Sequence, residues 1–250
     1  MDEEDLDQPQ TLIAHLTELR DRILRCLISI FIIFLFLFPF ANEIYEFVSL
    51  PLRNLLPEGT SMIATEVASP FLTPFKLSML SSLYLAMPYI LFQTWRFIAP
   101  GMYLTEQRIA VPILSSSIIL FYAGTAFAYF VVFPLVFGFF TNVAPDGIEI
   151  MTDINRYLDF VLKLFFAFGI SFEIPVVAII LILTGVTTAD RLANKRPFIL
   201  VGCFVIGMLL TPPDVISQSL LAIPMWILFE LGIFLARRIE PSRDKEDPSD

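Results

Sequence analysis

Long runs of apolar residues alternate with short polar segments along this chain. The first run, 26–42, contains no charged residue, and the second, 77–95, lies between Lys76 and Arg96. A helix needs about 20 apolar residues to cross the roughly 30 Å hydrocarbon core of a bilayer. Four further apolar runs follow, so the pattern predicts an all-α integral membrane protein with six transmembrane helices. We place these spans at residues 23–42, 75–96, 109–137, 158–184, 197–211 and 215–236.

Prolines, glycines and charges predict where the later spans end. The third run is uncharged over 109–145, which is too long for one crossing, and Pro134 and Gly138 predict the end of its helix. A Thr-Pro-Pro-Asp segment at 211–214 predicts a tight turn, because proline cannot donate to a helix. Only 17 uncharged residues precede this aspartate and only 15 separate it from Glu230, so we expect short fifth and sixth helices.

Lysines and arginines predict the orientation, because cytoplasmic loops are enriched in them. With a cytoplasmic N-terminus, 12 of the 16 basic residues fall on or near the inner side. Only Arg53, Lys76, Arg156 and Lys163 fall on or near the outer side. An even number of spans returns the chain to its starting side. We therefore expect a multi-pass protein of the bacterial cytoplasmic (inner) membrane, with both termini in the cytoplasm.

The segments outside the spans divide into caps and tails. The two long outer segments, 43–70 and 139–156, contain turn signals and enough apolar residues to pack as caps. The acidic residues 1–10 and the tail 238–250 are expected to be disordered. A single membrane domain, 11–237, lies between them.

Composition narrows the available chemistry. The chain is 56% hydrophobic and 16% charged, against about 25% charged for soluble domains. Nine of the 25 acids lie in 2–7 and after Pro241, so the net charge of −9 says little about the membrane body. The single histidine, His15, excludes His-rich metal sites, and no phosphate-binding loop or serine nucleophile motif occurs. We expect no enzyme activity, cofactor, metal or nucleic-acid partner.

Glu173 is the most informative charge inside a predicted span. An acidic residue at the middle of a membrane helix costs roughly 2.5–3.5 kcal/mol. Its side chain should therefore face protein or a water-filled hollow, and Pro175 should loosen the helix beside it. A functional role and a structural hydrogen bond to another span are both compatible with this position.

The remaining polar residues of the spans have simpler interpretations. Asp159 and Lys163 lie one turn apart, so pairing or snorkelling accounts for them. Glu230 is expected to reach Arg237 or the membrane interface. Gln218 could form a hydrogen bond across helices.

Two acids are predicted at the inner surface. Residues 12–23 have apolar positions at helical spacing, which predicts an amphipathic helix at the interface before the first span. On it, Glu18 and Arg22 are four residues apart, a spacing that favours an ion pair. Glu106, the only acid in residues 67–145, lies in the first inner loop. Pairing or solvation is the simple interpretation of each acid, but both fall on one side of the membrane.

Seven motifs carry a family resemblance. They are His15-Leu16-x-Glu18-Leu19-Arg20-x-Arg22, Ser69-Pro70-Phe71 with Lys76, Phe97-x-x-Pro100-x-x-Tyr103-x-x-Glu106, Phe127-x-Tyr129-Phe130 with Phe133-Pro134, Phe172-Glu173-x-Pro175, Lys195-Arg196-Pro197 and Thr211-Pro212-Pro213-Asp214. In this order, together with six apolar runs, they resemble TatC, the multispanning receptor subunit of the twin-arginine protein translocase. The resemblance covers nearly all of residues 15–237.

The resemblance implies a curved, glove-like arrangement of the six helices. It also implies a receptor for signal peptides with consecutive arginines on folded precursor proteins. Glu18, Arg20 and Glu106 match the family's signal-binding positions, and carboxylates can pair with guanidinium groups through charge-assisted hydrogen bonds. Glu173 would face the hollow of the glove.

The resemblance further implies partners and a driving force. Met208, Thr211 and Gln218 would dock single-span TatA- and TatB-like proteins, and the chain would self-associate within a larger complex. Transport would be driven by the proton-motive force without ATP. Motif or loop positions expected to be structural are Pro51, Pro70, Phe97, Tyr129, Pro212 and Asp214.

A proton-coupled small-molecule transporter with Glu173 as its carrier group is the main alternative. Such a transporter needs several polar groups at a site near the membrane midplane, and this chain has few beyond Glu173 and Gln218. A membrane-embedded hydrolase is a weaker alternative, because no nucleophile–base pair is evident.

Overall fold

The computed structural model describes residues 12–55, 62–98, 110–143, 152–211 and 215–239. Within these ranges the chain is helical apart from short connections and one isolated bridge. The helices are α1 (Leu12–Leu37), α2 (Ala41–Leu55), α3 (Ser69–Ile98), α4 (Ala110–Phe127), α5 (Phe133–Val143), α6 (Ile154–Ser171), α7 (Ile174–Leu183), α8 (Ala189–Ala193), α9 (Arg196–Leu210) and α10 (Val215–Ile239), with a 3-10 turn η2 (Phe38–Phe40) and a π-helical turn η5 (Ala128–Val132).

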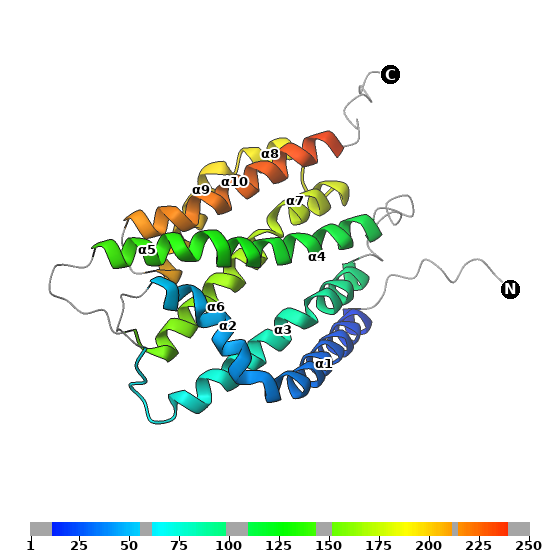
Figure 1. The fold of residues 1–250 in the computed structure, drawn as a ribbon. Coiled ribbons are helices and arrows are strands. Elements are labelled where there is room, and N and C mark those ends of the chain that lie inside the picture. Colours follow the sequence, from blue (N-terminus) through cyan, green and yellow to red (C-terminus); the bar gives the residue numbers. More distant parts are fainter. Residues whose placement is uncertain (1–11, 56–61, 99–109, 144–151, 212–214, 240–250) are drawn as a thin grey trace, which may run out of the picture.

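The helices stand side by side in a curved row (Figure 1). α1 forms one edge and packs chiefly on α3, whereas α9 forms the other edge and packs chiefly on α10. Between the edges, α3, α4 and α6 contact one another, and α7 contacts α10. The start of α1, the end of α3 and the end of α10 lie at the same end of the molecule, which agrees with the predicted orientation.

Five helical stretches are long and apolar enough to cross a membrane. They are Ala14–Leu50, Ser69–Phe97, Val111–Phe140, Ile154–Leu183 and Val215–Arg238. α9 is short, as expected: its 15 residues span only about 22 Å. The sixth helix is not short, because α10 has 25 residues and continues through Glu230, whose charge is paired with Arg196.

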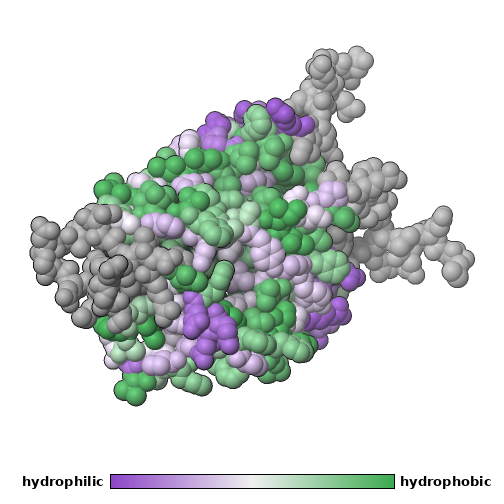
Figure 2. All heavy atoms as spheres, viewed as in Figure 1, coloured by the Kyte–Doolittle hydropathy of each residue, from purple (hydrophilic) through white to green (hydrophobic). Residues whose placement is uncertain are grey.

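The surface reflects this architecture. Much of the face seen in Figure 2 is apolar, and hydrophilic residues gather at the end where α1 begins and α10 ends. A second hydrophilic patch lies over α2, in the first outer segment. The pattern is that of helices whose flanks face lipid and whose ends face water.

Pro88, inside α3, removes a backbone donor that a neighbouring helix replaces. The Tyr84 carbonyl, four residues earlier, would accept that missing N–H in a regular helix. Tyr122 of α4 donates its hydroxyl to this carbonyl at 2.9 Å. The bond satisfies a group that hydrocarbon could not, and it joins α3 to α4.

Pro51 lies inside α2, so the turn expected around it is wrong. Its missing N–H leaves the Phe47 carbonyl without a helical donor, and the Tyr129 hydroxyl donates to that carbonyl at 3.2 Å. Tyr157 donates to the next carbonyl, that of Val48, at 2.9 Å. Two tyrosines therefore hold α2 as a helical cap against η5 and α6.

The third span continues to Val143, past both Pro134 and Gly138, so the predicted end is wrong. The π-helical turn η5 immediately precedes the proline, and the Phe133 N–H bonds the Ala128 carbonyl five residues earlier. A wider turn accommodates the proline ring and its missing donor without ending the helix.

The fourth span is interrupted at Glu173, as Pro175 predicts. α6 ends at Ser171 and α7 begins at Ile174. The α7 side of this break packs closely on α10, because a Cβ added to Gly232 would lie 2.9 Å from the Pro175 Cα. Gly232 therefore permits an approach that a larger residue would prevent.

Asp153 ties the two outer segments together. One carboxylate oxygen accepts the N–H groups of Asn155 and Arg156 at 3.0 Å and caps α6, while the other accepts the Thr65 hydroxyl at 2.7 Å and its N–H at 2.9 Å. The bond from the Thr65 hydroxyl and the backbone bonds lower the pKa of Asp153 to about 2. This stabilisation is complete above the ordinary pKa and is lost as the pH falls through about 2.

We expect Tyr122→Phe to lower the free energy of unfolding by about 1 kcal/mol, because the Tyr84 carbonyl loses its donor. In a Pro88→Ala background the restored amide can bond that carbonyl, so the same substitution should have little effect. Unfolding of the four proteins in detergent measures this coupling. Equal losses in both backgrounds would show that the hydroxyl acts elsewhere.

Candidate functional site at the inner ends of α1 and α3

The first turns of α1 and the last turns of α3 lie together at the inner end of the molecule (Figure 1). This end presents Glu18, Arg20 and Arg22 from α1 and Phe97 from α3. The N-terminal segment is helical, as predicted, but it is not a separate interfacial helix. No glycine or proline interrupts residues 12–37, and one continuous helix includes both the segment and the first span.

Arg22 uses all five of its N–H groups. Nε and Nη2 both bond the Glu18 Oε1 atom, Nε at 3.0 Å. Nη1 bonds the side-chain oxygen of Gln93 at 3.2 Å and its carbonyl oxygen at 3.4 Å, while Nη2 also bonds the Arg96 carbonyl at 3.0 Å. Gln93 in turn donates to the Tyr89 hydroxyl at 2.7 Å. The Arg22 side chain is only 13% exposed, so this network joins α1 to α3 away from solvent.

The predicted pairing of Glu18 with Arg22 is confirmed, and it uses one carboxylate oxygen. Both bonds from Arg22 end on Oε1, whereas Oε2 receives no hydrogen bond from the described residues. The Glu18 side chain is 30% exposed. Glu18 therefore has a fixed orientation and one oxygen available to a donor from outside.

Arg20 and Phe97 lie near this pair without bonding to it. The Arg20 guanidinium bonds its neighbour Asp21 at 2.8 and 3.0 Å, and the Arg20 side chain is 70% exposed. Phe97 stacks on His15, with ring centroids 4.3 Å apart. The stack is a second contact between the inner ends of α1 and α3.

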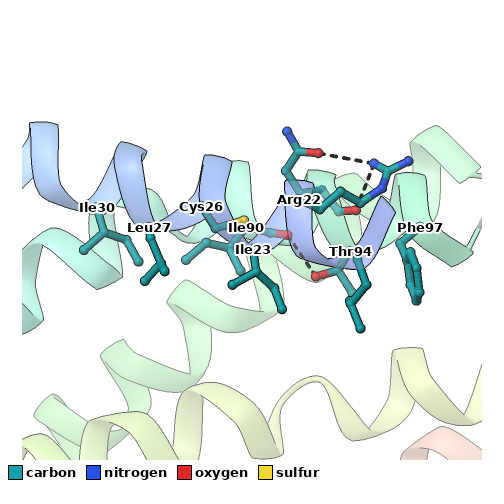
Figure 3. A pocket seen from close by; sticks show the side chains of 10 residues that line it. Arg22, Ile23, Cys26, Leu27, Ile30, Ile90, Thr94 and Phe97 are labelled. Carbon is teal, nitrogen blue, oxygen red and sulfur yellow. Dashed lines mark hydrogen bonds between the residues drawn. The ribbon is translucent and has the colours of Figure 1, made fainter. Parts of the chain in front are cut away.

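A groove of about 310 Å³ runs from this site along the α1–α3 interface (Figure 3). Its lining is almost entirely apolar, with Arg22, Gln93 and Thr94 as the polar exceptions. The lining residues are Leu19, Arg22, Ile23, Cys26, Leu27, Ile30, Ile90, Gln93, Thr94 and Phe97. The ion pair of Arg22 and Glu18 lies at one end of the groove, and apolar side chains line the rest. The groove is therefore suited to a segment with a charged end and an apolar part.

Several predicted positions fall outside the described residues. They include the second inner acid, Glu106, and the motif residues Pro212 and Asp214. Their roles stay predictions. Pro70 is described and lies in the first turn of α3, where a proline is compatible with a helix start.

Glu173 lies at the break between α6 and α7. The Ser117 hydroxyl of α4 donates to its Oε2 atom at 2.7 Å. Its Oε1 atom is buried and has no hydrogen-bond partner within the described chain. The carboxyl group therefore faces protein, as expected from the cost of exposing it to lipid, and retains one unused oxygen.

The three predicted docking residues have different environments. Met208 of α9 is 49% exposed, whereas Thr211 is buried and its hydroxyl bonds the Gly207 carbonyl at 2.9 Å. Gln218 of α10 donates to the Phe204 carbonyl of α9 at 2.7 Å. The predicted bond across helices is thus present, and it holds α9 against α10.

Asp159 and Glu230, for which the sequence offers pairing as one of two interpretations, have other partners. Asp159 pairs with Lys76 of α3 and not with Lys163 on its own helix. Glu230 forms a bidentate pair with Arg196 at 2.6 and 2.8 Å and not with Arg237. In both cases a cation on a neighbouring helix satisfies the acid and also joins two helices.

Comparison with known proteins identifies the family. The family model described as Sec-independent protein translocase protein (TatC) matches residues 14–224. The chain belongs to the TatC family. TatC from Azotobacter chroococcum mcd 1 is 60% identical over 245 residues, covering 98% of this chain and 95% of the relative. TatC from Escherichia coli K12 is 56% identical over 243 residues, covering 97% and 94%.

Solved TatC structures have the same fold. A crystal structure of the twin-arginine translocase receptor TatC matches with a TM-score of 0.81 at 38% identity, covering 90% of this chain and 98% of the other. The same receptor crystallised in DDM matches with a TM-score of 0.82. The predicted all-α, glove-like fold is confirmed, and α9 accounts for the TatC span that is too short to qualify by length. The chain is a multi-pass inner-membrane translocase protein of a non-enzymatic family.

Part of the network at the inner ends of α1 and α3 cannot be predicted from the sequence. The spacing predicts Arg22 only as a partner of Glu18 within one helix, and it gives no sign that Gln93 and Tyr89 take part. Gln93 lies 71 residues from Arg22, and a glutamine in an apolar run gives no sign of its partner. Among the described residues, no cluster of His, Cys, Asp or Glu is placed to hold a metal.

Proposed function

We propose that this chain binds the twin-arginine signal peptides of folded precursors at the cytoplasmic face, as the core receptor subunit of the translocase. The observation that carries the proposal is the open Oε2 atom of Glu18 beside an apolar groove. A carboxylate held in one orientation is a strong acceptor for a guanidinium group. Glu106, in the segment between α3 and α4, would supply the carboxylate for the second arginine, and the exposed Arg20 would contact the signal from the same surface.

The groove between α1 and α3 would receive the apolar segment that follows the arginines. On α1 it runs from Leu19, next to Glu18, to Ile30, about 16 Å further along the helix. Burial of apolar surface contributes about 25 cal/mol per Å², so this contact would add affinity that two ion pairs alone do not supply. A signal with arginines followed by an apolar segment matches the order of charged and apolar groups in the site.

Single-span TatA- and TatB-like subunits would dock on α9. This helix packs chiefly on α10, and apolar side chains are exposed along the face of α9 that does not pack. These are Phe198, Val201, Val205, Met208 and Leu209. Gln218 and Thr211 would act indirectly, by holding α9 in place. Self-association in a larger complex and transport driven by the proton-motive force belong to the same proposal.

A proton-coupled small-molecule transporter has less support. Its site would have to be built around Glu173, and Ser117 is the one hydrogen-bond partner that the described residues provide for this carboxyl group. Membership of a protein translocase family also favours the receptor. We assign Glu173 to a step after the signal has docked, because it lies at the break between α6 and α7 and its hydrogen bond is to Ser117 of α4, outside the α1–α3 contact that carries Glu18.

We expect Glu18→Gln and Glu106→Gln each to weaken binding of a twin-arginine signal peptide by about tenfold, the equivalent of one charge-assisted hydrogen bond. Photo-crosslinking of the peptide to membranes measures this, with a twin-lysine peptide alongside. Glu46→Gln, an exposed acid of the outer segment, is the matched control and should bind normally. Wild-type crosslinking by the double variant would overturn the assignment.

Occupation of the groove should shield Cys26, which lines it. In a Cys203→Ala background, a twin-arginine signal peptide should slow maleimide labelling of Cys26 several-fold. A peptide that keeps its arginines but has a serine-rich segment in place of the apolar one should not protect. If both peptides protected equally, the apolar segment would have to lie elsewhere.

For Glu173, we expect the Ala variant to bind the signal peptide normally but to export a folded precursor several-fold more slowly. The variant removes the carboxyl group that holds Ser117 and leaves the inner site unchanged. Crosslinking and export assays on the same membranes separate the two steps. Export at the wild-type rate would show that the role of Glu173 is limited to a structural hydrogen bond.

A further inference from the structure

We infer that Arg22 is a positioning residue that gives Glu18 its preference for arginine over lysine. The inference rests on the proposed function, because it concerns how Glu18 meets the signal peptide. It comes from the hydrogen bonds of the Arg22 side chain, which contacts both the proposed acid and the end of α3.

Arg22 is held too firmly to compete with the signal for Glu18. All five of its N–H groups have acceptors, and three of the five bonds end on α3. A signal arginine that displaced it would leave a largely buried charge and the acceptors on Gln93 and Arg96 without partners. We therefore expect Arg22 to stay in place when the signal binds.

The position of Arg22 determines what Glu18 offers. Because Nε and Nη2 both bond Oε1, the carboxylate cannot rotate freely, and Oε2 receives no bond from Arg22. A guanidinium has N–H groups in fixed directions and gains from an acceptor that is already oriented. A lysine ammonium has donors that rotate around its terminal bond, so it gains little from the same orientation.

The charge of Arg22 acts in the same direction. It neutralises Glu18, so an incoming cation meets an ion pair with little net charge. A lysine binds mainly as a point charge and loses most of its attraction, whereas an arginine keeps its directional hydrogen bonds. Orientation and neutralisation together favour arginine.

The α3 side of the network holds Arg22 in turn. The two bonds from Arg22 Nη1 to Gln93, dashed in Figure 3, cross from α1 to α3. Gln93 is 4% exposed and bonds Tyr89 one turn earlier, so its side-chain oxygen is directed at Arg22. The geometry of Glu18 is therefore set from the neighbouring helix.

The test is Arg22→Lys, measured as the ratio of affinities for a twin-arginine and a twin-lysine signal peptide. We expect binding of the twin-arginine peptide to fall about tenfold and binding of the twin-lysine peptide to change little, so the ratio falls by about the same factor. Arg25→Lys is the matched control. Arg25 is exposed one turn further along α1, and the described residues offer it no hydrogen bond or ion pair, so its ratio should not change.

Gln93→Met gives an independent readout if Arg22→Lys fails to fold. It leaves Glu18 and Arg22 in the chain but removes one acceptor of Arg22 and the bond to Tyr89. We expect the affinity ratio to fall in the same direction by a smaller factor. Thermal unfolding of each variant separates loss of fold from loss of discrimination.

Three results would overturn the inference. Tighter twin-arginine binding by Arg22→Lys would make Arg22 a competitor, and an equal loss for both peptides would make its role structural. An unchanged ratio in both variants would remove any role in specificity. The proposed function fails differently and independently of Arg22: the wild-type chain would show no preference for arginine, or Glu18→Gln would bind as well as wild type.

Discussion

A polar group inside a bilayer must find its partner within the protein, because hydrocarbon offers none. Several hydrogen bonds and ion pairs between helices in this chain, within the spans and at their ends, meet that requirement. Tyr122 replaces the donor that Pro88 removes, and Tyr129 does the same for Pro51. The pairing of Glu230 with Arg196 lets α10 continue as a helix beyond its apolar stretch. Each of these contacts satisfies a polar group and joins two elements at once.

The same constraint shapes the inner site. Arg22 lies one residue before the predicted first span, and it satisfies its five donors on Glu18 and the end of α3. The result is a firmly held cation and a carboxylate with one unused oxygen. The same contact therefore stabilises the fold and orients the carboxylate to which we propose the signal peptide binds. The apolar groove begins at this contact, so charged and apolar recognition lie next to each other.

The features that the sequence predicts well depend on nearby residues. Apolar runs identify the spans, Pro175 marks the break at Glu173, and the spacing of Glu18 and Arg22 predicts their pair. The predictions that fail concern residues whose partners lie far along the chain, and prolines whose missing donors are compensated by other hydrogen bonds. The sequence offers pairing with Lys163 or snorkelling for Asp159, but Lys76 on α3 is its partner, and that choice depends on packing.

The proline errors have a related cause. Pro134 does not end its helix because the π-helical turn before it accommodates the proline ring. Pro51 does not form a turn because Tyr129 donates to the carbonyl that the proline leaves without a helical donor. Neither compensation is visible in the residues around the proline. Gln93 illustrates the limit for the site, since its importance comes from a residue on another helix.

The most direct test of the account is a structure of the chain with a bound twin-arginine signal peptide. We predict that one signal guanidinium lies within hydrogen-bond distance of Glu18 Oε2, while Arg22 keeps its bonds to Glu18, Gln93 and Arg96. Signal arginines bound away from Glu18, or an Arg22 side chain displaced from α3, would contradict the account.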